Sequence, residues 1–218
     1  MTLKAQLDAF KAEFIEKFPA DKAAIMEQAT AALEKTFAPA LKVGDSAPEF
    51  TLPNATGKQA SLTEALREGP VILNFYRGGW CPYCNLELRA YQQVLPKIKA
   101  AGASLLAISP QAPDTSLSTA EKNELEFEVL SDQGSNVAES YGLAFTLPDE
   151  LQKLYTELNH VLPKVNGTPD WQLPVPATFV IDQDRKIILA YADVDYRNRL
   201  EPADAIAALK ELPQLSKA

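Results

Sequence analysis

The sequence is poor in the residues on which disulfide frameworks and metal sites are built. Its 218 residues include two cysteines, Cys81 and Cys84, and a single histidine, His160. Proteins stapled by disulfides carry more cysteines, spread along the chain. A zinc site would need two further ligands beside the pair, and His160 is far away in the sequence, in a stretch with a helical pattern. The cysteines are therefore either a redox pair or two inert core thiols.

The sequence also lacks the features typical of nucleic-acid-binding and membrane proteins. Its formal net charge of -8 would repel DNA, RNA and anionic lipids. It has no continuous apolar run of the length, about eighteen residues, that a membrane-spanning helix needs. Residues 1–8 are interrupted by charges and do not resemble a secretory signal. We therefore expect a cytoplasmic protein that binds neither nucleic acid nor membranes.

What is present predicts one folded domain with an N-terminal addition. Hydrophobic residues make up 46% of the chain, which is enough for a sizeable core. Residues 1–40 carry two apolar stripes at helical spacing, the first ending at Pro19 and the second before Pro39. We predict that this helical extension caps part of the main domain, with a dimerisation arm as the alternative. The main domain is predicted over residues 41–218.

From residue 43 the pattern changes to short strands that alternate with helices. Apolar, β-branched runs predict buried strands at 71–76, 103–109 and 127–130. Such alternation is typical of parallel βαβ units with helices on both faces of the sheet. Further predicted elements are a capped helix from Ser61, a helix over 148–162 within a helical insertion near 145–170, a hairpin of 178–182 with 186–191, and a last helix over 202–212. The sequence thus predicts an α/β protein with a central mixed sheet flanked by helices.

The cysteine pair lies where a predicted buried strand passes into a helix. Pro82 fits the first turn of a helix, because its missing N–H is not needed there. Cys81 then lies at or beside the N-cap, near free backbone N–H groups and the positive end of the helix dipole, and both favour a thiolate. Cys84 lies one turn further along the same face. This placement predicts a reactive redox pair rather than two buried structural thiols.

Residues just before the pair are secondary candidates for the site. Trp80 either shields the sulfurs from water or belongs to the core. Arg77 is close enough in sequence to add positive charge beside a thiolate, although most arginines are simply exposed. Gly78 and Gly79 give the backbone freedom to turn sharply before the cysteines.

Three segments resemble a known family: residues 43–52, 75–84 and 176–182. Together they are similar to the peroxiredoxin-like branch of the alkyl hydroperoxide reductase and thiol-specific antioxidant (AhpC/TSA) family, within the thioredoxin superfamily. The similarity covers roughly residues 41–212. It implies a thioredoxin-like fold and a thiol-dependent oxidoreductase.

The resemblance implies two alternative roles for the cysteines. Peroxiredoxins carry a Thr-x-x-Cys-x-x-Glu pattern, which residues 81–87 fit with cysteine in place of threonine. In that frame Cys84 attacks the peroxide, Cys81 resolves the sulfenic acid, and Glu87 is the glutamate of the pattern. Thioredoxins and glutaredoxins use Trp/Tyr-Cys-x-x-Cys, and in that frame Cys81 attacks and Cys84 resolves.

A second departure from the peroxiredoxin pattern bears on the same choice. Peroxiredoxins usually place an arginine shortly before the strand that corresponds to residues 178–182 here, but residues 173–177 contain none. A peroxidase would need Arg77, Arg197 or Arg199 to supply that charge. Pro176 instead resembles the cis-proline that faces the cysteines in thiol–disulfide exchange proteins.

Three functions follow as hypotheses. The first is a thiol peroxidase that reduces hydroperoxides and is recycled by thioredoxin, glutaredoxin or glutathione. The second is a thioredoxin-type disulfide reductase. The third is a redox-switched binding module, in which the helical extension reports the state of the pair. We expect no cofactor and no metal ion, and the resemblance is compatible with a homodimer.

Overall fold

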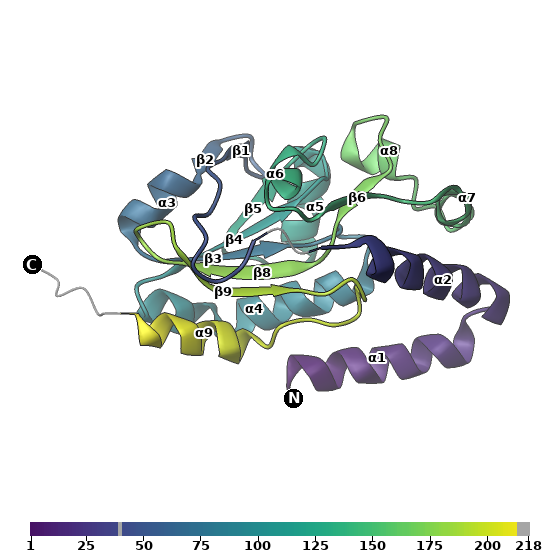
Figure 1. Cartoon of the computed structure of the whole chain (residues 1–218), viewed down its shortest axis with the longest axis horizontal. Helices are drawn as coiled ribbons and strands as arrows, with labels where there is room; N and C mark the ends of the chain where they lie inside the picture. Colours follow the sequence, from purple (N-terminus) through teal and green to yellow (C-terminus); the bar gives the residue numbers. More distant parts are fainter. Residues whose placement is uncertain (39–40, 213–218) are drawn as a thin grey trace, which may run out of the picture.

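The centre of the protein is a five-stranded mixed sheet (Figure 1). The computed structural model describes residues 1–38 and 41–212. Strand order is β5-β4-β3-β8-β9, with β3, β4 and β5 parallel and with β8 and β9 antiparallel to their neighbours. The five strands are β3 (Val71–Phe75), β4 (Ser104–Ser109), β5 (Glu128–Ser131), β8 (Ala177–Ile181) and β9 (Ile187–Ala192). The predicted α/β fold with a central mixed sheet is confirmed.

Helices cover both faces of this sheet. The helices α4 (Pro82–Ala100) and α9 (Pro202–Glu211) lie on one face, whereas α3 (Leu62–Glu68) and α6 (Asn136–Ser140) lie on the other. Successive residues of a strand point to opposite faces. Leu73 accordingly packs with the α3 side and Ile72 with the α4 side. All five residues of β3 are buried, which explains why four of them are apolar, and the fifth, Asn74, is a buried polar residue.

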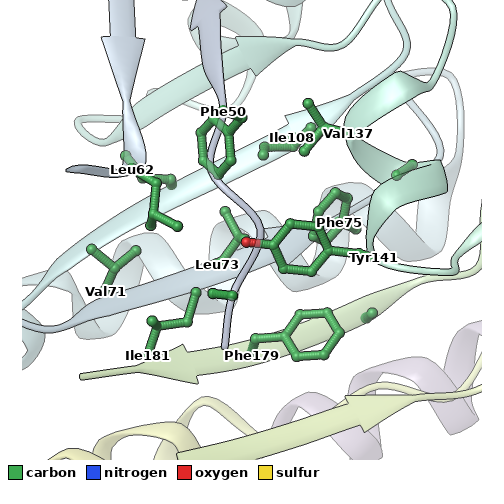
Figure 2. Close-up of a cluster of buried hydrophobic side chains, with 14 of the residues drawn as sticks. Phe50, Leu62, Val71, Leu73, Phe75, Ile108, Val137, Tyr141, Phe179 and Ile181 are labelled. Atoms are coloured by element: carbon green, nitrogen blue, oxygen red, sulfur yellow. The ribbon is translucent and has the colours of Figure 1, made fainter. Parts of the chain in front are cut away.

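An aromatic cluster fills the core on the α6 side. Figure 2 shows Phe75 from β3, Phe179 from β8 and Tyr141 facing one another. Their ring centroids are 5.1 to 6.2 Å apart, within the range of favourable aromatic contacts. The cluster anchors the end of β3 from which the chain leads to the cysteines.

Smaller elements surround the sheet. They are β1 (Thr51–Pro53), β2 (Gln59–Ser61), α5 (Pro113–Lys122), β6 (Ala144–Thr146), α7 (Asp149–Glu157), α8 (Leu162–Asn166) and β7 (Gln172–Pro174). The predicted cap at Ser61 is confirmed, since its hydroxyl accepts a hydrogen bond from the Glu64 amide at 3.2 Å. The single helix predicted over 148–162 is wrong. The chain leaves the helix after Glu157 because Asn159 adopts a positive φ of 60°.

Two N-terminal helices are present as predicted, α1 (Leu3–Lys17) and α2 (Ala20–Thr36). Leu3 and Leu7 of α1 are buried against the first turn of α4. The backbone amides of Leu3 and Lys4 donate to the Glu201 carboxylate at 3.2 and 2.7 Å. The neighbouring helix α2 lies alongside α7 (Figure 1), and Pro39, predicted to follow it, is outside the described residues. We propose that residues 1–40 form an extension that caps the redox domain.

No helix in the described ranges is long and apolar enough to cross a membrane.

The packing of α1 yields the first prediction. Replacing Leu7 by alanine should lower the free energy of unfolding by about 2–4 kcal/mol, because Leu7 is 4% exposed and its truncation leaves a cavity. The matched control is Ile15→Ala on the same helix, where the side chain is 60% exposed and the change should stay below about 0.5 kcal/mol. Urea unfolding followed by circular dichroism measures both. Equal, small effects would contradict the packing of α1 on the domain.

Candidate active site

The cysteine pair lies at the carboxyl end of β3, where the chain enters α4. Cys81 is the N-cap of α4 and Pro82 is its first residue, as the sequence predicts. Both cysteines are free thiols and both are buried, with exposed fractions of 1% for Cys81 and 0% for Cys84. The Cys81 side chain makes no full capping hydrogen bond, but the backbone N–H of Cys84 helps to lower the Cys81 pKa, in line with the expectation from its position at the helix start. Stabilisation of a thiolate on Cys81 therefore comes mainly from the Cys84 thiol and from charged side chains.

Two glycines allow close packing just before the pair. Gly78 has a φ of +145°, and a Cβ there would lie 2.4 Å from the indole nitrogen of Trp80. A Cβ on Gly79 would lie 2.1 Å from the hydroxyl oxygen of Thr119. Both distances are below any real contact, so the glycines are required by space as well as by the turn. They let Trp80 fold back over the segment that leads to Cys81.

The positive charge closest to Cys84 comes from Arg199. This residue lies between β9 and α9, and its Nη2 is 3.4 Å from Cys84 Sγ. Its Nε donates to Glu87 Oε2 at 2.7 Å, and both side chains of this ion pair are 1% exposed. Arg197, the other arginine of the segment, instead pairs with Asp195 and with Glu27 of α2. Arg199 therefore supplies positive charge at the Cys84 sulfur. The sequence alone left this role open among Arg77, Arg197 and Arg199.

Glu87 holds Arg199 through a buried polar network. Its second oxygen, Oε1, accepts from the side-chain amide of Asn74 at 3.0 Å, and the same amide donates to the Thr178 hydroxyl at 3.1 Å. Burial raises the pKa of Glu87 to about 7, although the positive charge of Arg199 opposes this shift. A buried ion pair is tolerable only when its atoms are hydrogen-bonded in this way. The network therefore fixes where the guanidinium of Arg199 points.

Arg77 is buried rather than exposed, with an exposed fraction of 3%. Its guanidinium lies over the rings of Tyr196, Trp80 and Tyr155, at 4.2, 5.2 and 5.7 Å from their centroids. One terminal nitrogen donates to the Tyr155 hydroxyl, whereas Nε has no hydrogen-bond partner among the described residues. Arg77 thus brings a second positive charge to the site and keeps one donor unused.

The two cysteines ionise very differently. Burial opposes ionisation of Cys81, but a hydrogen bond with the Cys84 thiol and the charges of Arg77 and Arg199 outweigh it and lower the Cys81 pKa to about 6. Burial raises the pKa of Cys84 well above its ordinary value, and the negative charge on Cys81 adds to that shift. The pair therefore carries one thiolate near neutral pH, shared across a sulfur–sulfur hydrogen bond and compensated by two arginines.

The prediction that Pro176 is a cis-proline is wrong. No cis peptide bond occurs within residues 1–38 and 41–212. Pro176 lies between β7 and β8. The Val175 amide donates to the Leu143 carbonyl at 2.9 Å, and the Pro176 carbonyl accepts from the Asp193 amide at 3.3 Å. The cis-proline that would have favoured disulfide exchange is therefore absent from the described residues.

His160 is brought close to Trp80, although it is distant in sequence. Their rings are 5.2 Å apart, and the Tyr155 ring packs edge-on against Trp80 at 5.5 Å. Within the part of the chain that the structure describes, no three His, Cys, Asp or Glu side chains cluster as a metal site would require. Trp80 is half-buried at the centre of these rings and forms one wall of the site.

The sequence of the redox domain matches a known family profile. The profile described as the AhpC/TSA family covers residues 43–190. The chain belongs to the AhpC/TSA family. This match includes Cys81, Cys84 and Glu87 but excludes α1, α2 and Arg199.

Individual relatives of this AhpC/TSA protein are similar over parts of the chain. Peroxiredoxin Bcp of Escherichia coli is 35% identical over 103 residues, which are 47% of this chain and 65% of that protein, so the match spans under two thirds of the relative. A putative peroxiredoxin of Mycobacterium tuberculosis is 30% identical over 71% of this chain and 87% of its own length. Thiol-disulfide oxidoreductase ResA of Bacillus thuringiensis is 25% identical over 74% of this chain and 76% of its own length.

A solved structure shares the architecture. The crystal structure of peroxidoxin BcpB from Mycobacterium tuberculosis is 25% identical, covers 79% of this chain and 99% of its own, and superposes with a TM-score of 0.63. A putative thiol:disulfide interchange protein DsbE from Chlorobium tepidum, 23% identical with a TM-score of 0.53, covers 78% of this chain and 99% of its own. The second likeness concerns the fold alone.

The buried ion pair yields a prediction on stability. Replacing Glu87 by leucine should lower the free energy of unfolding by about 3–5 kcal/mol, because Arg199 is left buried without a counter-charge. Adding Arg199→Leu to a Glu87→Leu variant should recover part of that loss, since no unpaired charge then remains. Chemical denaturation of the single and double variants measures the difference. A double variant as unstable as the sum of the singles would contradict the coupling of this pair.

Proposed function

We propose that the protein is a thiol peroxidase that reduces hydroperoxides through Cys81 and Cys84. The observation that carries the proposal is the contact between the Arg199 guanidinium and the Cys84 sulfur. A cation at the sulfur stabilises the attacking thiolate and can also bind the peroxide oxygen on which negative charge develops. Arg199 takes the place of the arginine that residues 173–177 lack.

The proposed reaction cycle has three steps. The Cys84 thiol passes its proton to the Cys81 thiolate, and the Cys84 sulfur then attacks the terminal oxygen of the hydroperoxide as the O–O bond breaks. The departing alkoxide or hydroxide takes a proton and leaves as alcohol or water. Cys84 is now a sulfenic acid. The Cys81 sulfur then attacks it, which releases water and forms a Cys81–Cys84 disulfide. A cellular thiol then reduces this disulfide by exchange and is itself oxidised to a disulfide. Glutathione is small enough for the buried pair, whereas thioredoxin or glutaredoxin requires the pair to become exposed first.

The burial of both sulfurs supports a small substrate. A protein disulfide must bring its own S–S bond into line with the attacking sulfur, and this needs an exposed thiolate. Cys81 and Cys84 are only 1% and 0% exposed. A hydroperoxide needs room for two oxygens and whatever group they carry. The site therefore suits a peroxide better than a folded protein.

A second function, small-molecule disulfide exchange, has one observation in its favour. Cys81 has the lowered pKa and lies at the helix N-terminus, which is the arrangement of an attacking cysteine in that chemistry. In this alternative Cys81 attacks the substrate disulfide and Cys84 releases the mixed disulfide. The similarity to ResA is consistent with it.

The decisive experiment compares the two substrates directly. Reduced protein is mixed with hydrogen peroxide or with a small disulfide, and loss of free thiol is followed by stopped flow in wild type, Cys81→Ser and Cys84→Ser. We expect fast peroxide consumption, with sulfenic acid trapped on Cys84 in the Cys81→Ser variant by mass spectrometry. Slow reaction with peroxide, together with a mixed disulfide on Cys81 in the Cys84→Ser variant, would instead establish disulfide exchange.

The pKa shifts predict how the pair depends on pH. Thiolate absorbance in the ultraviolet should rise as the pH increases through about 6, because Cys81 is protonated below that pH and ionised above it. Arg199→Met should move the midpoint to higher pH, since it removes a positive charge that favours the thiolate. Arg67→Met, on α3 and outside the site, serves as the control with an unchanged midpoint. A midpoint unaffected by loss of Arg199 would contradict its electrostatic role.

A further inference from the structure

A cavity of about 260 Å³ lies between the N-terminal extension and the redox domain. One wall is a face of α2 that includes Ala29 and Leu33, and the opposite wall includes Phe145 and Leu151 from β6 and α7. Helix α2 packs alongside α7 (Figure 1). The lining contains neither cysteine, so the cavity is separate from the place where the sulfurs react. Its walls are mainly apolar and favour a hydrocarbon group over water.

Arg77 is the one charged residue among those that line the cavity, and it is a buried cation without a carboxylate partner. Arg199 pairs with Glu87 and Arg197 pairs with Asp195, but Arg77 forms no ion pair with any described residue. Charged side chains are almost never fully buried unless they are paired, because an isolated charge is unfavourable in the interior. An acidic partner for this guanidinium is therefore missing from the described part of the chain.

The contacts that Arg77 does make leave hydrogen-bond donors free. Its side chain donates to the hydroxyl of Tyr155, a neutral acceptor. Its Nε–H is buried and has no partner among the described residues. The Tyr196 and Tyr155 rings, 4.2 and 5.7 Å from the guanidinium, line the same cavity and hold the group in place. The donors are thus fixed in position before any ligand arrives, which reduces the entropy lost on binding.

The combination of one cation with apolar walls selects a class of ligand. A carboxylate carries one negative charge, and its two oxygens match the fork of N–H groups on a guanidinium. A phosphate would bring more charge than Arg77 can balance into a mainly apolar space. A neutral alcohol would leave the guanidinium without a counter-charge. A monocarboxylate with a hydrocarbon group fits both halves of the cavity.

We propose that this cavity binds a small aliphatic monocarboxylate, with the carboxylate on the Arg77 guanidinium and the hydrocarbon chain between α2 and α7. The ligand is not a substrate, because no reacting sulfur lines the cavity. The inference does not depend on whether the cysteines reduce peroxides or disulfides.

The size of the cavity limits the length of the chain. A volume of about 260 Å³ accommodates on the order of eight or nine heavy atoms, if each occupies about the volume of a water molecule in the liquid. Hexanoate is of this size. The chain-length preference should therefore be centred on hexanoate, with a longer chain excluded by the walls.

Occupation of this cavity should be felt at the cysteine pair. Burial opposes ionisation of Cys81, and the charge of Arg77 is one of the factors that lower its pKa nevertheless. A carboxylate on Arg77 offsets part of that charge and so disfavours the thiolate. Because coupling between two sites is reciprocal, the thiolate in turn weakens binding of the carboxylate. The ligand would thus tune the reactivity of the pair from outside the reaction site.

The first test measures binding to the reduced protein by isothermal titration calorimetry. Hexanoate is compared with 1-hexanol, which has the same chain and no charge. We expect hexanoate to bind, and Arg77→Met to weaken hexanoate by about tenfold or more while 1-hexanol changes by less than about twofold. Arg67→Met, exposed on α3, should change neither. A hexanoate dissociation constant above about 10 mM in the wild type, or equal affinity for both ligands, would overturn the proposal.

A second pair of variants tests the location without altering Arg77. Ala29→Trp places a large ring in the cavity, whereas Ala31, two residues away on α2, is exposed and outside the lining. Ala29→Trp should weaken hexanoate by about tenfold or more, because the ring and the chain compete for one space. Ala31→Trp should leave the affinity unchanged. Equal affinities in the two variants would place the ligand elsewhere and overturn the proposal.

A third measurement uses the wild-type protein alone. At pH 6, where Cys81 is about half ionised, saturating hexanoate should lower the thiolate absorbance by about half, whereas 1-hexanol should not change it. Bound hexanoate with unchanged absorbance would overturn the pairing of its carboxylate with Arg77. No peroxide or disulfide is present in these measurements, so their failure leaves the proposed peroxidase function untouched, and failure of that function leaves the binding result untouched.

Discussion

The ion pair between Glu87 and Arg199 is the interaction on which the site depends. It lies in the interior, where an unpaired charge is strongly unfavourable, so each partner requires the other to be in place. Glu87 comes from the second turn of α4, and its other oxygen is bonded to Asn74 of β3. The central strand, the cysteine-bearing helix and the C-terminal segment therefore meet at one carboxylate. As a result the Arg199 guanidinium lies against the Cys84 sulfur.

The segment that carries Arg199 also links the N-terminal helices to the site. Tyr196 lies over the Arg77 guanidinium, and Arg197 pairs with Glu27 of α2. Glu201 accepts hydrogen bonds from the first amides of α1. Three side chains within six residues thus contact both extension helices and the second arginine. The extension and the redox pair are therefore connected through this short segment as well as through the packing of α1 on α4.

Different side chains around the sulfurs supply positive charge and exclude water. Charge is supplied by Arg199 and Arg77, both of which are buried and on opposite sequence sides of the pair. Exclusion of water is supplied by aromatic rings, with Trp80 packed against Tyr155 and His160. A low-polarity site strengthens the attraction between an arginine and a thiolate, because less water screens it. The same rings separate the sulfurs from a large partner while an apolar cavity reaches Arg77.

The sequence by itself determined the fold class and the position of the chemistry. β3, buried on both faces, is apolar except for Asn74, and Pro82 after Cys81 marks a helix start, so both signals are local. The positive charge at Cys84 was decided only by tertiary structure, because Arg199 is 115 residues away and no local spacing connects them. Contacts between distant segments depend on how whole elements pack, and an individual sequence motif carries no record of that packing.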